Sequence, residues 1–221
     1  MTSSDVQAEL RNRVSPASAA LIVIDVQNDF CAKGGYFEAT GADLSCIQAA
    51  ADRLVGFVNA ARAAGVMVVF VRSHYDPIYL SEAQNERRRR VGRFLPLCLQ
   101  GTWGADFYGL VPRTAEPIVT KHRYDGFFNT DLELVLRTNG IQCVLMTGVA
   151  TNTCVETTLR SAFVRDFTTV LVDDCAGART QRAHDSTLEN VRNNFGIVAR
   201  ADEVEREWSR LMDRTRTAVA G

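Results

Sequence analysis

The feature that most restricts the fold of this chain is a regular alternation of short apolar runs with amphipathic stretches. Residues 20–24 read Ala-Leu-Ile-Val-Ile, an uninterrupted apolar run typical of a strand that is buried on both faces of a sheet. The amphipathic stretch at residues 47–64 predicts a helix, and Gly65 follows it at the position that glycine favours just beyond a helix C-terminus. Doubly buried strands separated by helices indicate an α/β fold with a parallel sheet.

The alternation continues to the end of the chain. Further strands are expected at residues 66–71, 117–120, 141–147, 169–172 and 197–199. Further helices are expected at about residues 130–138, 154–164, 183–193 and 202–214. We therefore expect a single α/β domain over residues 1–221, doubly wound in the Rossmann-like, three-layer manner, with helices on both faces of a mainly parallel sheet and an N-terminal arm at residues 1–18.

The least regular part of the chain is residues 73–109, which contain the consecutive arginines Arg87–Arg90. A run of like charges is most often the solvated face of a helix. Long irregular insertions in compact folds are often functional, so the alternative is a lid whose arginines attract an anionic substrate. The sequence leaves open whether these arginines contact substrate or solvent.

Charge and composition narrow the classes of partner. The formal net charge is −1 and the sequence pI about 6.3, so no overall positive field attracts nucleic acid or an anionic membrane. The first residues lack the apolar core of a secretory signal, and no later stretch has the roughly 18 apolar residues of a membrane span. We therefore expect a cytoplasmic protein whose ligand is a small molecule.

Three reactive side chains follow separate predicted strands. Asp25 comes directly after the first apolar run, Lys121 follows the strand at residues 117–120, and Cys154 lies beyond the strand at residues 141–147. Each alone has an ordinary explanation: a turn former, an exposed lysine, an inert buried thiol. Because ligands of open parallel sheets bind at the carboxyl ends of the strands, their joint placement predicts that a base, a cation and a thiol meet at one edge of the sheet.

Cys154 has a further argument for reactivity. Thr153 and Glu156 have the spacing of a capping box, which places Cys154 in the first turn of a helix, where the helix dipole favours a thiolate. A thiolate beside a carboxylate and an ammonium is an activated nucleophile. The other five cysteines form no Cys-x-x-Cys pair and no Cys/His cluster, so they are expected to be small buried apolar side chains.

Two stretches carry a family resemblance. The sequences LIVIDVQNDF at residues 21–30 and TGVATNTCV at residues 147–155 resemble the two signatures of the isochorismatase-like cysteine hydrolases, within a similarity over about residues 19–199. The resemblance implies a triad with Asp25 as acid and base, Lys121 as electrostatic partner and Cys154 as nucleophile. It also implies a cis peptide bond before Ala150 and an oxyanion hole made by the backbone N–H groups of Ala150 and Cys154.

The resemblance extends to the class of substrate. Residues 121–130 (KHRYDGFFNT) are similar to the ureidoacrylate amidohydrolases, and residues 29–36 less closely to the biuret hydrolases, which implies a ureido or N-carbamoyl substrate that releases ammonia through a thioester. It also implies that Asn28, Phe30 and Tyr124 contact the substrate. A carboxylate on the substrate could meet Arg72, Arg123 or the arginine run.

Several contrasts and alternatives remain. True isochorismatases lack the cysteine nucleophile, so Cys154 argues against their reaction. Nicotinamidases carry a metal site built on histidines that lie between the first two members of their triad. Here His74 is the only histidine between Asp25 and Lys121, so no metal and no cofactor are expected. His74 itself is expected at the surface or the pocket rim. The alternatives are a plain carboxamide amidase of nicotinamidase or maleamate type, a catalytically silent binding subunit, and a redox sensor. The resemblance also implies a homo-oligomer, a dimer or tetramer.

Overall fold

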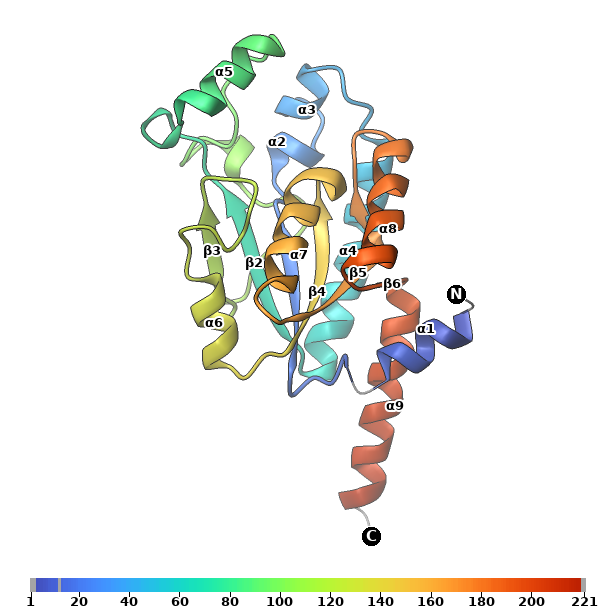
Figure 1. Ribbon diagram of the computed structural model, residues 1–221. Helices are drawn as coiled ribbons and strands as arrows, with labels where there is room; N and C mark the ends of the chain where they lie inside the picture. Colours follow the sequence, from blue (N-terminus) through green and yellow to red (C-terminus); the bar gives the residue numbers. More distant parts are fainter. Residues whose placement is uncertain (1–2, 12, 220–221) are drawn as a thin grey trace.

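The core of the protein is a six-stranded sheet with the order β3-β2-β1-β4-β5-β6, seen in a computed structural model that describes residues 3–11 and 13–219 (Figure 1). The strands are β1 (Ala19–Ile24), β2 (Met67–Ser73), β3 (Ile118–Lys121), β4 (Cys143–Val149), β5 (Thr168–Gly177) and β6 (Ile197–Ala199). All five strand pairings in the described part of the chain are parallel. The expected doubly wound α/β fold is therefore confirmed, and the sheet is parallel throughout.

The strand order places a switch point between β1 and β4. The chain builds outward from β1 through β2 to β3, then returns to the other side of β1 and builds outward again through β4, β5 and β6. Connections from the two adjacent strands therefore leave in opposite directions, which opens a crevice beyond their carboxyl ends. In β1, Ile24 pairs with Gly148 of β4, so the residues that follow both strands face this crevice.

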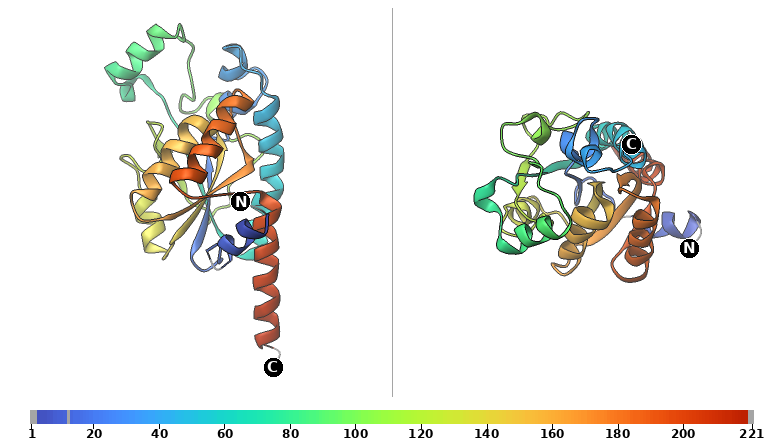
Figure 2. Two further views of the ribbon diagram at one scale, coloured as in Figure 1. Left: turned by 45° about the vertical axis from the view of Figure 1, so that its right-hand side comes forward. Right: turned by 90° about the horizontal axis from the view of Figure 1, so that it is seen from above.

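Helices cover both faces of the sheet, as expected (Figure 2). One face carries α1 (Ser3–Leu10), α4 (Ser45–Ala64) and α9 (Ala201–Val219); the other carries α6 (Leu132–Thr138), α7 (Glu156–Phe163) and α8 (Gln181–Asn194). Alternate residues of β1 divide between the two cores: Leu21 and Val23 pack with the first set of helices, and Ile22 and Ile24 with the second. The uninterrupted apolar run is required because both faces are covered.

The expected N-terminal arm is packed against the domain. Leu10 and Val14 are fully buried in the same core as α4 and α9. Trp208 of α9 donates its indole N–H to the carbonyl of Val14 over 2.9 Å and stacks on Phe57 of α4, with ring centroids 5.1 Å apart. Residues 13–18 therefore lead directly from the arm into β1 and help to fix the position of α9.

The irregular insertion contains α5 (Glu82–Arg90) between two single-turn helices, η1 (Pro77–Tyr79) and η2 (Trp103–Ala105). Figure 1 shows α5 beyond the carboxyl ends of the strands, at the same end of the molecule as α2 (Asn28–Cys31) and α3 (Tyr36–Ala39). Helix α5 begins with a capping box between Ser81 and Gln84. The insertion is thus a structured projection over the edge of the sheet where the reactive residues end.

In the described part of the chain, no helix combines the length and the apolar character needed to cross a bilayer.

Candidate active site

Asp25 occupies the first position after β1 and is fully buried. Its backbone has a φ of 53°, a left-handed conformation that non-glycine residues adopt infrequently, and its amide donates to the carbonyl of Val71 over 2.8 Å. This turn directs the carboxylate across the ends of β2 and β3. Oδ2 of Asp25 lies 2.7 Å from Nζ of Lys121, and Oδ1 accepts a 2.9 Å hydrogen bond from the hydroxyl of Ser73.

Lys121 is the last residue of β3, and its side chain is also fully buried. Its ammonium donates to Oγ of Ser73 over 2.8 Å and to the carbonyl of Arg123 over 3.0 Å. Burial by itself would lower the pKa of Lys121, but the charge of Asp25, followed by that of Cys154, more than offsets this, and the pKa is raised well above its ordinary value. Lys121 is therefore a fixed cation inside the protein.

Cys154 completes the group from the other side of β1. Its thiol lies close enough to Asp25 and Lys121 for both to influence its pKa, and the residue is 6% exposed. Burial raises the pKa of the Cys154 thiol to about 12, with Lys121 lowering it and Asp25 raising it. The structure thus brings together the three predicted reactive residues, and the thiol is protonated at neutral pH. Burial therefore outweighs the charge of Lys121 that favours a thiolate.

The predicted capping box before Cys154 is also wrong. Residues Thr151–Val155 form a π-helical turn, α7 begins at Glu156, and neither helix start has a side-chain cap. Glu156 instead accepts hydrogen bonds from Thr187 over 2.7 Å and Asn190 over 2.5 Å, both on α8. The Glu156 carboxylate, which the local spacing predicted to cap the helix, therefore forms tertiary hydrogen bonds with α8 instead.

The turn that precedes Cys154 follows the sequence-based expectation in its backbone. The peptide bond between Val149 and Ala150 is cis, as the family resemblance implied. Gly148, one position earlier, has a φ of 107°, and a Cβ there would lie 2.0 Å from the carbonyl oxygen of Ile24. Only glycine fits this approach of β4 to β1, which sets the start of the turn beside Asp25.

A cavity of about 330 Å³ opens onto Cys154. Phe30 and Tyr124, two of the predicted substrate contacts, line it, as does Ala150 of the predicted oxyanion hole. Asn28 is not among the lining residues. Its side-chain amide donates to the carbonyl of Trp103 over 2.8 Å and so holds the insertion against α2. The remaining lining residues are Tyr36, Phe37, Tyr75, Arg87, Arg93, Leu97, Val149, Asn152, Thr153, Arg179, Thr180 and Ala183.

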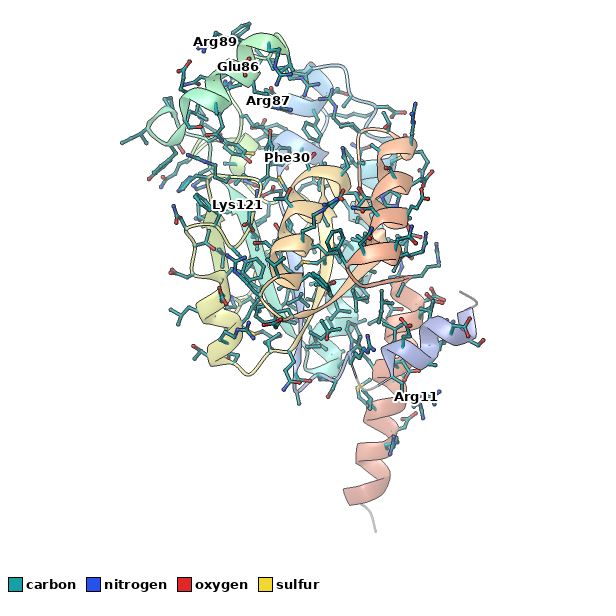
Figure 3. The ribbon with its side chains drawn as sticks, viewed as in Figure 1. Arg11, Phe30, Glu86, Arg87, Arg89 and Lys121 are labelled. Atoms are coloured by element: carbon teal, nitrogen blue, oxygen red, sulfur yellow. The ribbon has the colours of Figure 1, made fainter. Side chains whose placement is uncertain are left out.

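Three of the lining residues are arginines, and no Asp or Glu among the described residues lines the cavity. Arg87 belongs to the arginine run and lies over the ring of Tyr124, 5.9 Å from its centroid. Arg93 follows α5, and Arg179 follows β5. Figure 3 shows Arg87 and Phe30 at the same end of the molecule as Lys121. The cavity is therefore lined by the Cys154 residue on the turn after β4 and by the guanidinium groups of Arg87, Arg93 and Arg179.

The remaining arginines that the sequence brought into consideration are engaged outside the cavity. Arg88 donates to backbone carbonyls of residues 93–95, Arg89 pairs with Glu82, and Arg90 pairs with Glu86. Arg72 donates to Thr120, and Arg123 to the carbonyls of Tyr79 and His122. Of the run, only Arg87 contributes to the cavity, so most of the run is the charged helix face that such sequences usually form.

Ser73, Tyr75 and Arg179 belong to the site but were not predicted. Ser73 ends β2 and links Asp25 to Lys121; it could have been found from its place after an apolar run, as Asp25 was. Tyr75 is buried and contacts the Ser73 hydroxyl over 3.3 Å. Arg179 was missed because β5 runs to Gly177, five residues beyond the expected end of the strand at residue 172, so its position at a strand end was not visible in the pattern.

His74 is 6% exposed, so the expectation that it lies at the surface or pocket rim is wrong. It continues directly from β2, and its carbonyl accepts a 2.7 Å hydrogen bond from Nδ1 of His122. Burial lowers the pKa of His74. Among the described residues, no group of three or more His, Cys, Asp or Glu side chains could hold a metal ion.

Comparison with known proteins places this site in a family. Residues 19–203 match the isochorismatase domain, and the chain therefore belongs to the isochorismatase family. It is 36% identical over 202 residues to ureidoacrylate amidohydrolase RutB of Serratia proteamaculans (strain 568), an alignment that covers 85% of this chain and 82% of the relative. With such relatives the chain is an amidohydrolase of this fold.

Solved structures agree with the family assignment. A cysteine hydrolase from Pseudomonas syringae pv. phaseolicola 1448A is similar with a TM-score of 0.76 and 25% identity, covering 89% of this chain and 95% of that one. N-carbamoylsarcosine amidase from Thermoplasma acidophilum is similar with a TM-score of 0.67 and 25% identity, covering 84% and 97% respectively. The expected resemblance to isochorismatase-like hydrolases is confirmed.

Proposed function

We propose that this protein hydrolyses the terminal C–N bond of a small ureido or N-carbamoyl compound that carries a carboxylate, and that it releases ammonia through a thioester on Cys154. The observation that carries the proposal is the buried Asp25–Lys121 pair, whose two charges act on the buried Cys154 thiol, at an arginine-lined cavity that Cys154 lines. The relatives named as a ureidoacrylate amidohydrolase and an N-carbamoylsarcosine amidase support the class of substrate.

The proposed reaction begins with a protonated thiol. Asp25 accepts the proton of Cys154 as the sulfur attacks the carbonyl carbon, so the thiolate forms only during bond formation and beside the Lys121 ammonium. The carbonyl π electrons move to oxygen, where the backbone N–H groups of Ala150 and Cys154 stabilise the oxyanion; such donors contribute about 3–4 kcal/mol each in other hydrolases. Lys121 keeps its charge throughout because its raised pKa holds the proton.

The second half of the reaction returns the enzyme to its starting state. The oxyanion collapses, the C–N bond breaks, and Asp25 gives its proton to the leaving nitrogen, which departs as ammonia. Water then loses a proton to Asp25 and attacks the carbonyl carbon of the acyl group on sulfur. The C–S bond breaks, and the sulfur recovers its proton from Asp25. Asp25 thus acts alternately as base and acid, which requires a carboxylate with hydrogen-bond partners that do not exchange with solvent, as Ser73 and Lys121 provide.

The carboxylate of the substrate is assigned from the environment of Arg179. Its Nη2 donates to the carbonyl of Thr40 over 2.9 Å, while Nη1 is buried and has no hydrogen-bond partner in the described structure. Burial lowers the pKa of Arg179, and the nearby charges of Arg93 and Arg87 lower it further against the opposing effect of Tyr36. A buried donor without a partner costs about 1–3 kcal/mol, and a substrate carboxylate would satisfy it while screening the three like charges.

The test is a panel of paired substrates that differ only in the carboxylate. N-carbamoyl amino acids, their methyl esters and simple carboxamides such as nicotinamide are compared by ammonia release. We expect turnover of the N-carbamoyl acids with kcat/KM at least tenfold above that of their esters, and loss of turnover in Cys154→Ala and Cys154→Ser. Equal rates for acid and ester would show that the carboxylate is not recognised, and a preference for nicotinamide would indicate a plain carboxamide amidase. No turnover of any substrate would indicate a binding subunit.

A further inference from the structure

A second group of polar side chains, linked by hydrogen bonds, lies outside the cavity and next to the turn that carries Cys154. The hydroxyl of Thr151 lies 3.0 Å from Nδ1 of His184, and Nε2 of His184 lies 2.8 Å from Oδ1 of Asp173. Thr151 begins the π-helical turn, His184 lies on α8, and Asp173 on β5. Thr151 is fully buried and His184 is 7% exposed. The proposed triad uses none of the three.

Asp173 fixes the direction of its hydrogen bond with His184 and thereby orients the ring. The hydrogen bond from His184 is the main cause that lowers the pKa of Asp173, so Asp173 remains a carboxylate, and a carboxylate can only accept. Nε2 of His184 must therefore carry the hydrogen. Nδ1 is then the ring nitrogen that pairs with the Thr151 hydroxyl, which can act as donor or acceptor. Asp173 thus determines, through the imidazole, the rotamer and orientation of the Thr151 side chain.

Thr151 is attached to the part of the backbone on which the proposed chemistry depends. It directly follows Ala150, whose carbonyl accepts from the amides of Thr153 over 2.9 Å and Val155 over 3.3 Å. At the other end of the turn, the carbonyl of Cys154 accepts a 2.7 Å hydrogen bond from the hydroxyl of Thr158. The segment between the two proposed oxyanion donors is therefore held by side-chain contacts, and the Thr151 contact is the one nearest to Ala150.

We propose that Asp173, His184 and Thr151 form a relay of positioning residues that holds the turn at residues 149–155, so that the N–H groups of Ala150 and Cys154 point at the developing oxyanion. This inference rests on the proposed function, because it assigns those two amides the role of oxyanion donors. The relay touches neither the substrate nor the reacting atoms. It acts through the backbone of the turn, from two elements that pack against it, α8 and β5.

Such a role has a kinetic consequence that simple structural support lacks. An oxyanion donor contributes only where negative charge develops on oxygen, so its misplacement slows acylation without preventing substrate binding. Misplacement of about 1 Å can cost on the order of 100-fold in rate. Alkylation of a thiol by iodoacetamide is displacement at a saturated carbon and forms no oxyanion. The two reactions at the same sulfur therefore separate the position of the amides from the reactivity of the thiol.

The experiment compares acylation of Cys154 by p-nitrophenyl acetate with its alkylation by iodoacetamide at pH 8.5. Thr151→Val keeps the shape of the side chain and removes the hydroxyl, and His184→Gln can still reach Asp173 but not Thr151. For both we expect acylation to fall about 10- to 100-fold, alkylation to stay within about threefold, and KM for the N-carbamoyl substrate to change little. Thr151→Ser restores the hydroxyl and should stay within about threefold of the unsubstituted protein in both reactions.

Thr169→Val is the matched control. The Thr169 hydroxyl is equally buried and donates to the carbonyl of Phe195 over 2.7 Å, away from the turn at residues 149–155. Its loss should lower the melting temperature and leave both reactions of Cys154 unchanged.

Two outcomes would overturn the relay: unchanged acylation in Thr151→Val, or acylation and alkylation that fall together. Because p-nitrophenyl acetate acylates the thiol directly, these outcomes can be read even if the protein turns over no ureido compound. Absence of ammonia release from every substrate of the panel would count against the proposed function and not against the relay.

Discussion

Nζ of Lys121 lies 2.7 Å from Oδ2 of Asp25, and both side chains are completely excluded from solvent. Burying a charge costs several kcal/mol of solvation free energy, and the attraction between Asp25 and Lys121 offsets this cost only while both charges are present. The two charges therefore depend on each other for the stability of the fold, in addition to their part in the proposed chemistry. The pair places a permanent positive charge close to the sulfur.

Removing one member of the pair should destabilise the protein severely. Lys121→Met leaves the Asp25 carboxylate buried without its counter-ion, and we expect the free energy of unfolding to fall by about 3–5 kcal/mol, with no ammonia release. Urea denaturation followed by circular dichroism measures the first effect. The double variant Asp25→Asn/Lys121→Met has no uncompensated charge, so it should be more stable than Lys121→Met. A double variant that is less stable than the single one would contradict this account of the pair.

Ser73 should matter to activity more than its size suggests. Its hydroxyl donates to Asp25 over 2.9 Å and accepts from Lys121 over 2.8 Å, so Ser73→Ala removes one hydrogen bond from each. We expect a loss of about 1–3 kcal/mol of stability and a fall in kcat of at least tenfold, because the carboxylate loses a fixed partner. Ser209→Ala, at an exposed hydroxyl on α9, serves as the control in both assays. Normal kcat in Ser73→Ala would show that Asp25 does not need this contact.

The sequence predicted the parts of this site that depend on strand pattern. An apolar run followed by a polar residue identified Asp25 and Lys121, because parallel strands deliver their carboxyl ends to one edge. It did not predict contacts set by tertiary packing: Glu156 caps no helix because α8 offers it Thr187 and Asn190, and Arg179 reaches the cavity because β5 runs farther than its apolar residues indicate. Local patterns predict elements and their ends, whereas the partners of a side chain depend on the elements that pack beside it.

Arg179 should determine the preference for a carboxylate. In Arg179→Gln the guanidinium is lost while the amide can still donate to Thr40, so we expect KM for N-carbamoyl acids to rise about 10- to 100-fold and KM for their methyl esters to change little. Steady-state kinetics on the two series measure the difference. Arg90→Gln, outside the cavity and paired with Glu86, should leave both KM values unchanged. An equal effect of Arg179→Gln on acid and ester would remove Arg179 from carboxylate recognition.

The reactivity of Cys154 should increase steadily with pH. Because burial raises the pKa of its thiol to about 12, the thiolate fraction in the free protein should grow about tenfold per pH unit between pH 7 and pH 10. The alkylation rate by iodoacetamide, followed by mass spectrometry of the Cys154 peptide, should rise in proportion without levelling off. Lys121 stays charged over this range because its own pKa is raised well above its ordinary value. A plateau below pH 8 would instead indicate the resting thiolate that the capping-box pattern predicted.

Gly148 should be irreplaceable, because it controls how closely β4 approaches β1. A Cβ at this position would lie 2.0 Å from the carbonyl oxygen of Ile24, and the φ of 107° adds strain for any other residue. We expect Gly148→Ala to lose at least about 4 kcal/mol of stability or to fail to fold, measured by urea denaturation.

Gly140→Ala is the control. Gly140 has a φ of 68° and open space around it, so this variant should lose only about 1–2 kcal/mol. The residues that follow Ile24 and Gly148 lead to Asp25 and to the turn of Cys154, so any Gly148→Ala protein that folds must separate these strands and, with them, the carboxylate from the thiol. Near-normal stability together with near-normal acylation in this variant would show that the close approach of the two strands is not what brings these side chains together.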